Sequence, residues 1–236
     1  MEGSTPVLSL AVVREGGEVL SRMRFDQGES HSRLLPGILD ELLANAGIGV
    51  EDLSGIAVGI GPGAFTGLRV ILATAKGLAY ARRLPLVGVS SLEALAAAVP
   101  APAGATIVPL LDARKKEVYA GFFRREEEGL RSLSPAAALS PDRLVEKLAE
   151  LPAPLVLLGE GYRVYRDRLD EATEGRRLDI EGLPRTPPAE EVGRLALGRE
   201  LVFSKEALFA LEPDYVRSSE AELGWTKSPR PPAGSH

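Results

Sequence analysis

A glycine-rich loop between a strand and a helix constrains this fold more than any other part of the sequence. The loop is GIGPGAFTGLR at residues 59–69, with the short apolar run SGIAVGI leading into it and a long apolar-periodic segment following it to about Arg82. A buried strand that turns directly into a helix is the repeating unit of α/β proteins. The sequence therefore predicts an α/β fold in which this loop sets how the strand meets the helix.

The rest of the first half alternates strands and helices in the same way. Two β-rich runs, at 7–13 and 18–25, flank a glycine-containing turn and predict a hairpin. The segment SHSRLLPGILDELLANAG then predicts a helix, with serines for its N-cap and Gly47 as its terminator. After the helix that follows the loop, PLVGVSS predicts a strand and LEALAAAV a short helix.

A Pro/Ala stretch at 100–104 separates two halves with a similar order of elements. The second half has strand patterns within 106–133, a helix with Ser140 as N-cap, and the buried run LVLLGEGY ending in a glycine turn. We therefore predict duplicated domains at 1–99 and 104–204, each a mixed sheet with flanking helices. The chain is predicted to be helical from Pro187 to about Leu211. A C-terminal helix at 205–220 can join the first domain, and the tail at 227–236 is predicted to be disordered.

Composition excludes several functional classes. The chain has 236 residues and no cysteine, which excludes disulfides, thiolate nucleophiles and cysteine-ligated zinc. Its formal net charge is -5 and its arginines are interleaved with acids, which argues against nucleic-acid binding by this chain alone. No segment has the pattern of a signal peptide or a membrane span, so we expect a cytoplasmic protein without membrane contact.

The loop also matches parts of two phosphate-binding motifs. Gly59, Gly61 and Ala64 satisfy the dinucleotide pattern, but no acidic residue occurs from Leu53 through Leu92 to hold a ribose. The Walker pattern fails because Lys76 lies far inside the helix. The favoured interpretation is structural: the glycines let the strand reverse tightly into a helix pressed on the sheet.

Three segments resemble the TsaB family, also called YeaZ: the block from Gly59 to Leu95, the hairpin LLDARKKEVYAGFF, and PDYVR. The similarity runs from about Ser4 to Arg217. It implies a two-domain fold of the actin, sugar-kinase and Hsp70 (ASKHA) type, and a non-catalytic role in making threonylcarbamoyladenosine in tRNA. It also implies partners: the homologous catalytic subunit TsaD and the ATPase TsaE, with a homodimer when TsaD is absent. Contact with tRNA is then expected only through the complex.

The residues themselves agree with the absence of a catalytic centre, a cofactor and a metal. Nucleotide-binding relatives of this fold carry an Asp followed by glycines in the second domain's first hairpin, whereas Asp112 is followed here by ARKKE. A turn without glycine does not readily form the positive-φ nest that binds phosphate. The two histidines, His31 and His236, make no plausible chelate. Two alternatives stay open: a sugar-kinase-like enzyme with a degenerate ATP site, and a hydrolase or protease that uses His31.

Without an active centre, function is expected at a surface, and the first two helices are the best candidates. The first has an apolar band from Leu34 to Leu43, broader than one sheet face requires. In the second, Ala73, Gly77 and Ala81 recur at every fourth position and leave a groove for another helix. Ordinary packing inside the domain is the alternative for each residue. The resemblance favours a partner interface, which we place at Leu35, Ile38, Leu39, Leu42, Phe65, Leu68, Ile71, Leu72 and Ala75.

The start of the chain departs from the family pattern. Family members begin with a buried apolar strand that ends in an Asp-Thr-Ser-Thr turn, and residues 2–5 occupy that turn here with only Met1 before it. The first strand is therefore expected to be missing. It is central to the sheet in this fold, so its loss removes two hydrogen-bonded ladders. Either the recorded start is late, or the first domain is rearranged or completed by another chain; a chain starting at Met1 is expected to have poor stability or an unusual first sheet.

Overall fold

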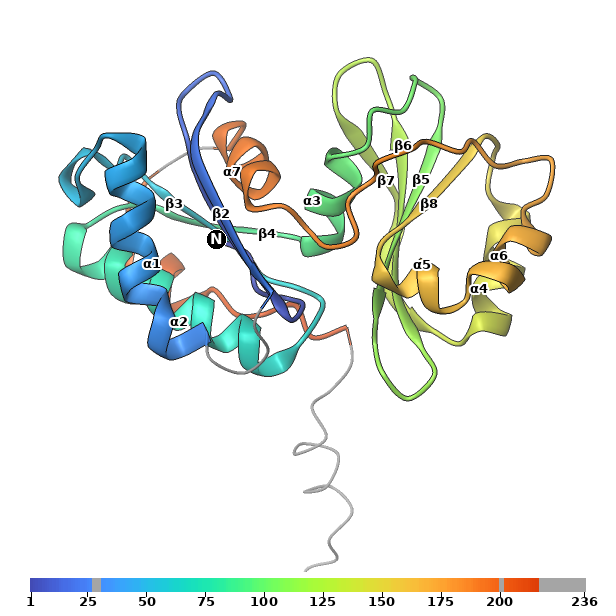
Figure 1. Ribbon diagram of the computed structural model, residues 1–236, viewed down its shortest axis with the longest axis horizontal. Helices are drawn as coiled ribbons and strands as arrows, with labels where there is room; N and C mark the ends of the chain where they lie inside the picture. The colour runs from blue at the N-terminus through green and yellow to red at the C-terminus, as the bar shows by residue number, and fades with distance from the viewer. Residues whose placement is uncertain (27–30, 200–201, 217–236) are drawn as a thin grey trace, which may run out of the picture.

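The computed structural model describes residues 1–26, 31–199 and 202–216, with side chains described from Leu35 onward in the first helix. Two lobes lie side by side, as Figure 1 shows, and both combine strands with helices. The chain builds the first lobe, crosses to the second after residue 90, and returns to the first after about residue 188. Residues from both ends of the chain therefore pack in the same lobe.

The first lobe contains two pairs of strands. β1 (Val7–Val13) and β2 (Val19–Asp26) form an antiparallel hairpin, and β3 (Ile56–Gly59) and β4 (Leu86–Val89) form a parallel pair. Among the described residues these are two separate two-stranded sheets. All four strands lie where the sequence predicted them.

Two long helices cover the strands of this lobe. α1 (His31–Ala46) ends before Gly47, which has a φ of 70°. A short 3-10 turn, Val50–Asp52, follows before β3. α2 (Phe65–Arg82) ends at Arg83, whose left-handed conformation lets its N–H reach carbonyls of the last turn.

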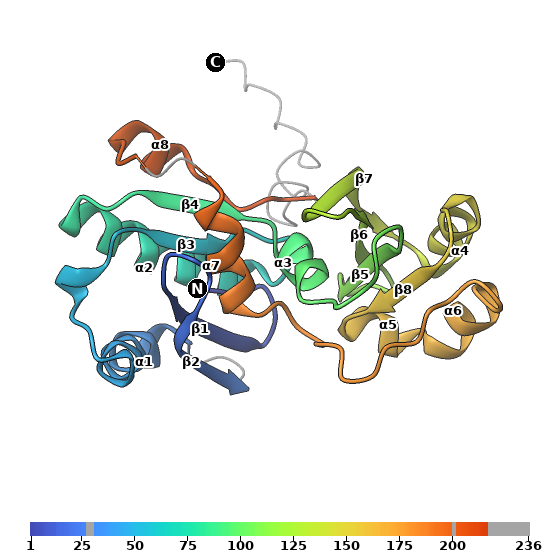
Figure 2. The same cartoon turned by 90° about the horizontal axis from the view of Figure 1, so that it is seen from above.

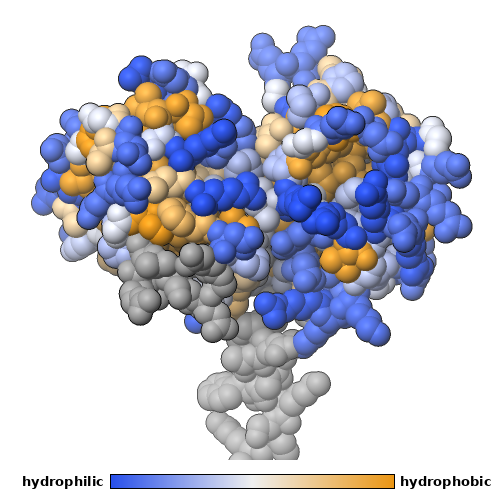
Figure 3. Space-filling model, viewed as in Figure 1, coloured by the Kyte–Doolittle hydropathy of each residue, from blue (hydrophilic) through white to orange (hydrophobic). Residues whose placement is uncertain are grey.

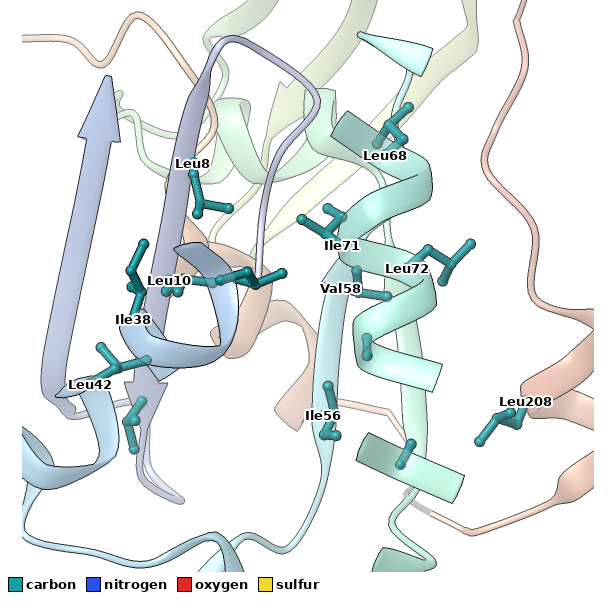
Figure 4. Packing of buried hydrophobic residues seen from close by; sticks show 14 residues of the cluster. Leu8, Leu10, Ile38, Leu42, Ile56, Val58, Leu68, Ile71, Leu72 and Leu208 are labelled. Atoms are coloured by element: carbon teal, nitrogen blue, oxygen red, sulfur yellow. The ribbon is translucent and has the colours of Figure 1, made fainter. Parts of the chain in front are cut away.

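The first core forms where these helices meet the strands. Leu8 and Leu10 of β1, Val58 of β3 and Ile71 of α2 are each at most 1% exposed. Figure 4 shows these side chains converging between the strands and α2, with Ile38 and Leu42 of α1 closing the other side. The apolar periodicity of the helices therefore serves this core.

The second lobe contains one mixed sheet in the order β7-β6-β5-β8. Its strands are β5 (Thr106–Asp112), β6 (Val118–Arg125), β7 (Leu130–Leu139) and β8 (Leu155–Leu158). Within the described part of this sheet, β5 and β8 pair in parallel and the other pairs are antiparallel. α4 (Pro141–Glu150), α5 (Glu160–Val164) and α6 (Arg166–Ala172) pack on it. Ser140 accepts the Arg143 N–H, as its predicted N-cap role requires.

The C-terminal part corrects two predictions. One helix was expected from Pro187 to about Leu211, but two short ones form: α7 (Ala189–Leu197), which ends at Gly198, and α8 (Lys205–Ala210). α7 packs against β1, β3 and β4, so assigning residues up to 204 to the second domain is wrong for this helix. Leu208 of α8 packs in the first core, but α8 stops well short of residue 220. The predicted disordered tail at 227–236 lies outside the described residues.

The lobes meet at α3 (Ser91–Ala97), which lies between them in Figures 1 and 2. Ser90 caps this helix by accepting the Glu93 N–H, and the Arg125 guanidinium of β6 donates to the Val99 carbonyl at 2.7 Å. The predicted α/β fold with a mixed sheet is therefore confirmed. The duplication of the domains and the loss of a first strand stay predictions.

Candidate functional site

The glycine loop before α2 uses its backbone amides inside the chain. The Gly59 N–H donates to the Met1 carbonyl at 2.8 Å, and the Gly61 N–H donates to Ser91 Oγ at 3.1 Å. An anion site needs several such amides aimed at one point. Because these amides hold the N-terminal residues and α3 instead, the geometry supports the structural interpretation of the loop.

Contact with the N-terminal residues explains why this loop needs glycine. A Cβ atom on Gly63 would lie 2.2 Å from the Ser4 carbonyl oxygen, and one on Gly67 would lie 2.2 Å from the Gly3 carbonyl oxygen. Gly61 has a φ of 102°, which glycine adopts without strain. The loop glycines thus let residues 3 and 4 touch the backbone at the start of α2.

Glu2 is the polar centre of this contact, and the sequence analysis did not identify that role. Its side chain is 1% exposed and accepts hydrogen bonds from the Ser4 N–H at 2.6 Å and from Ser91 Oγ at 2.8 Å. A buried carboxylate requires such donors. Ser91 is 89 positions away, and no local pattern marks a pairing at that distance.

The backbone conformation of the turn between β5 and β6 contradicts one expectation from the sequence, which concerned positive φ angles. Arg114, Lys115 and Lys116 have φ angles of 58°, 49° and 64°, so the claim that positive φ here needs glycine was wrong. Two hydrogen bonds within the turn stabilise it. The Arg114 N–H donates to the Asp112 carboxylate at 2.8 Å, and the Glu117 N–H donates to the Arg114 carbonyl at 2.9 Å. These bonds hold non-glycine residues in a conformation that costs about 1–2 kcal/mol each.

Two carboxylates, Asp112 and Glu160, interact at the carboxyl ends of β5 and β8. Burial raises the pKa of Glu160, the negative charge of Asp112 raises it further, and a hydrogen bond from the Asp112 backbone opposes both. No third ligand joins them: across residues 1–26, 31–199 and 202–216, no group of three His, Cys, Asp or Glu side chains could hold a metal. The pair therefore shows local charge repulsion.

The hydrolase alternative rests on side chains that the structure does not describe. His31 begins α1, but its side chain is outside the described set, and His236 lies outside the described residues altogether. The proposed role of His31 therefore stays a prediction.

The structure places most of the predicted interface residues inside the first core. Leu35, Ile71 and Ala75 are 0% exposed, Leu39 is partly buried, and Phe65 is 39% exposed. The other buried members are Ile38, Leu42, Leu68 and Leu72. In this conformation the buried residues hold α1 and α2 on the strands, so a partner can reach these helices only from their outer sides.

The outer side of α2 carries two exposed aromatic pairs. Phe65 stacks near Tyr215 with ring centroids 5.6 Å apart, and Tyr80 stacks near Phe209 at 5.8 Å. The Arg69 guanidinium lies 3.7 Å over the Phe65 ring. We call this region the α2 outer surface and define it by Phe65, Arg69, Ala73, Tyr80, Ala81, Phe209 and Tyr215, all of which are exposed.

Exposed aromatic side chains of this kind are uncommon on a surface that faces only water. Tyr80 is 48% exposed and Phe209 is 63% exposed. Exposed apolar patches mark interaction sites, and here aromatic side chains of α2 pair with those of the C-terminal segment. The sequence analysis identified Phe65 but not Tyr80 or Phe209, because their pairing depends on how α8 packs across α2. Figure 3 shows the face seen in Figure 1, where separate hydrophobic patches lie among hydrophilic residues on both lobes.

The comparisons with known proteins bear on the whole chain. The family model described as "TsaD: tRNA N6-adenosine threonylcarbamoyltransferase" matches residues 19–225. The chain is 30% identical to the "tRNA threonylcarbamoyladenosine biosynthesis protein TsaB" of Escherichia coli, with 97% of this chain and 96% of that protein aligned. The TsaB protein of Bacillus subtilis is also 30% identical, over 97% of each chain.

This chain belongs to the TsaB (YeaZ) family. A solved structure agrees: the protein of Pseudomonas aeruginosa described as having similarity to peptidase YEAZ has a TM-score of 0.72 and 29% identity. The match covers 92% of this chain and 97% of that one. The family resemblance predicted from the sequence is therefore confirmed. Within the described part of this TsaB-family chain, no helix is long and apolar enough to cross a membrane.

Proposed function

We propose that this chain is a non-catalytic subunit of the system that makes threonylcarbamoyladenosine in tRNA, where it binds and activates a TsaD homologue. Its relatives are named as biosynthesis proteins for this modification, which supports a role in the same system. The use of the glycine-loop amides within the chain supports a role without a nucleotide at that loop. Activation then comes from holding TsaD in its working arrangement.

The α2 outer surface is the observation that carries this proposal. Phe65 and Tyr80 lie at opposite ends of the helix, and the exposed small residues Ala73 and Ala81 lie on the same surface. Small residues let a partner helix approach closely, while flanking aromatic side chains supply most of the binding free energy in typical interfaces. We assign this surface to TsaD, with partly buried Leu39 of α1 at its margin.

The remaining partners are proposed from the family resemblance. TsaE, the ATPase, joins the pair after TsaD has bound. When TsaD is absent, two copies of this chain pair through the same apolar surface, because the surface is costly to leave in water. Transfer RNA is contacted only through the complex, which agrees with the interleaved charges of this chain.

Charged substitutions on the α2 outer surface test the docking proposal. Phe65→Glu and Tyr80→Glu are each expected to weaken binding of the TsaD homologue by about 2 kcal/mol, or roughly 30-fold in Kd. Val164→Glu is the matched control, because Val164 is 62% exposed but lies on α5 of the other lobe. Binding is measured by titration calorimetry, with circular dichroism to confirm that each variant is folded. Unchanged affinity of both α2 variants would rule out this surface.

Ile71 is unsuitable for this test, although the sequence suggested it. Its side chain is 0% exposed and lies in the first core, so a charge there is expected to unfold the lobe. Loss of TsaD binding by such a variant would report on folding alone. Leu39, which is partly buried, is a second test site only if its variant keeps the wild-type Tm.

A further inference from the structure

The helix between the lobes, α3, is buried on two sides, and each side packs against a different lobe. Leu92, Leu95 and Ala96 are 0% exposed and pack with strands of the second lobe. Ala94 is also 0% exposed and packs with β4 and α7 of the first lobe. Figure 2 shows the helix in this position. α3 is therefore part of the hydrophobic core on both sides.

The packing on these two sides is close. A Cβ atom added to Gly121 of β6 would lie 3.2 Å from the Leu92 Cβ, so the backbone of the second lobe lies directly against α3. On the other side Ala94 meets Val192 and Ala196 of α7, and both of these residues are buried. Rotation of one lobe relative to the other would pull α3 away from one of these surfaces. The hydrophobic effect opposes such a movement, because it exposes apolar side chains to water.

The amino end of α3 is hydrogen-bonded to the first lobe. The Ser91 N–H donates to the Gly61 carbonyl at 2.8 Å, and Ser91 Oγ accepts the Gly61 N–H at 3.1 Å. Gly61 belongs to the glycine loop between β3 and α2. These two bonds fix the start of the helix on the loop.

The carboxyl end of α3 is hydrogen-bonded to the second lobe through Arg125 of β6. Its Nη2 donates to three carbonyls that follow one another along the chain, those of Ala96 at 3.4 Å, Ala97 at 3.3 Å and Val99 at 2.7 Å. A cation is favourable at this end of a helix, where carbonyls lack partners within the helix. Burial lowers the pKa of Arg125, and the Glu191 carboxylate of α7 opposes this effect, so the guanidinium also senses a charge of the first lobe.

The second crossing between the lobes has little freedom to bend. The Glu160 N–H of the second lobe donates to the Arg185 carbonyl at 2.9 Å, and the next residue, Thr186, accepts a hydrogen bond from Arg24 of β2. The chain therefore changes lobes within one residue. Residues 187 and 188 are buried prolines, whose rings fix the φ angle.

We propose that α3 and Arg125 hold the two lobes in one fixed relative orientation, so that this chain meets its partners as a single rigid body. Closure of two lobes needs a hinge, which is a short segment that absorbs large changes in φ and ψ. Both crossings are instead buried and hydrogen-bonded to the two lobes. The orientation of the lobes is then set by folding and not by a ligand.

The distance between the lobes tests this proposal in the free chain. The chain contains no cysteine, so Glu15→Cys and Glu127→Cys provide two defined positions for nitroxide labels. Both residues are exposed, one in the β1–β2 turn and one in the β6–β7 turn. A second pair, Glu127→Cys with Glu146→Cys on α4, lies within the second lobe and serves as the reference.

Double electron–electron resonance is expected to give one peak for the pair that spans the lobes, no wider than the peak of the reference pair. A broader distribution, or two peaks, would overturn the proposal, because it would show that the lobes take up several orientations.

A substitution at Arg125 tests the part of that residue. Arg125→Met removes the three bonds to the end of α3 and is expected to broaden the distance distribution between the lobes by more than about 2 Å, the scale of a domain rearrangement. The reference pair is expected to stay unchanged, which shows that the second lobe is still folded. Arg124→Met is the matched control, because Arg124 bonds only to Thr106 and Pro152 among the described residues, and both lie in the second lobe. Equally narrow distributions for the two variants would contradict the role of Arg125.

Binding of the TsaD homologue extends the test, and this arm rests on the proposed function. At saturating TsaD the mean distance between the lobes is expected to shift by less than about 2 Å. A larger shift would overturn the fixed orientation. If calorimetry detects no binding of TsaD, the proposed function is contradicted, whereas the distances in the free chain still decide whether α3 fixes the lobes.

Discussion

At the scale of a residue, the surroundings of Glu160 change the pKa of its carboxyl group. Its pKa is raised from the ordinary value of 4.5, first by burial and then by the Asp112 charge. A carboxyl whose folded pKa is raised binds its proton more tightly in the folded state than in the unfolded state. Its contribution to stability is therefore most favourable below about pH 4.5 and is lost as the pH rises through the raised value.

Glu160→Gln is accordingly expected to raise the Tm at neutral pH, because it removes a partly buried charge and keeps an acceptor for the Asp112 backbone N–H. The gain is expected to shrink as the pH falls toward 4. Glu128→Gln, an exposed residue in the β6–β7 turn, serves as the control. Thermal unfolding followed across this pH range measures both, and a Tm gain that stays constant with pH would contradict the assignment.

At the scale of an element, two glycines of α2 differ in the space that is available for a side chain. A Cβ atom at Gly67 would lie 2.2 Å from the Gly3 carbonyl oxygen, whereas one at Gly77 meets nothing within 4 Å. We expect Gly67→Ala to destabilise the fold by about 1–3 kcal/mol through overpacking. Gly77→Ala is expected to stabilise it by about 1 kcal/mol, because alanine favours helix and the site has room.

Urea unfolding of the two alanine variants measures this difference. Both changes add one methyl group to the same helix, and the added methyl group meets the Gly3 carbonyl oxygen only at position 67. Equal stability of the two variants would show that the N-terminal residues do not press on α2.

At the scale of the whole molecule, the structure bears on the prediction that this chain does not bind a nucleotide. The loop amides before α2 are engaged by Met1 and Ser91, and the β5–β6 turn exposes three cationic side chains in place of the glycines that the sequence analysis expected of a phosphate-binding turn. We therefore expect the isolated chain to show no micromolar binding of ATP with magnesium. Titration calorimetry tests this, and micromolar affinity would favour the sugar-kinase-like alternative.

Sequence reasoning identified the elements of the fold well where local chemistry decides them. Gly47 ends α1, Ser140 begins α4, and the glycine loop joins β3 to α2, each as its residues predicted. At the candidate site, the sequence did not separate residues of the core from residues of a partner interface. Leu35 and Ile71 satisfy an amphipathic pattern equally well whether their partner is a β-sheet or another protein, so periodicity could not separate core from interface.

The sequence alone determined the family, the α/β class and the order of most elements, because these depend on motifs and periodicities within short segments. The tertiary structure decided which helix faces are enclosed, that α7 returns to the first lobe, and that Glu2 pairs with Ser91. Each of these depends on residues that are distant in sequence, and contact between such residues is fixed only when the whole chain packs.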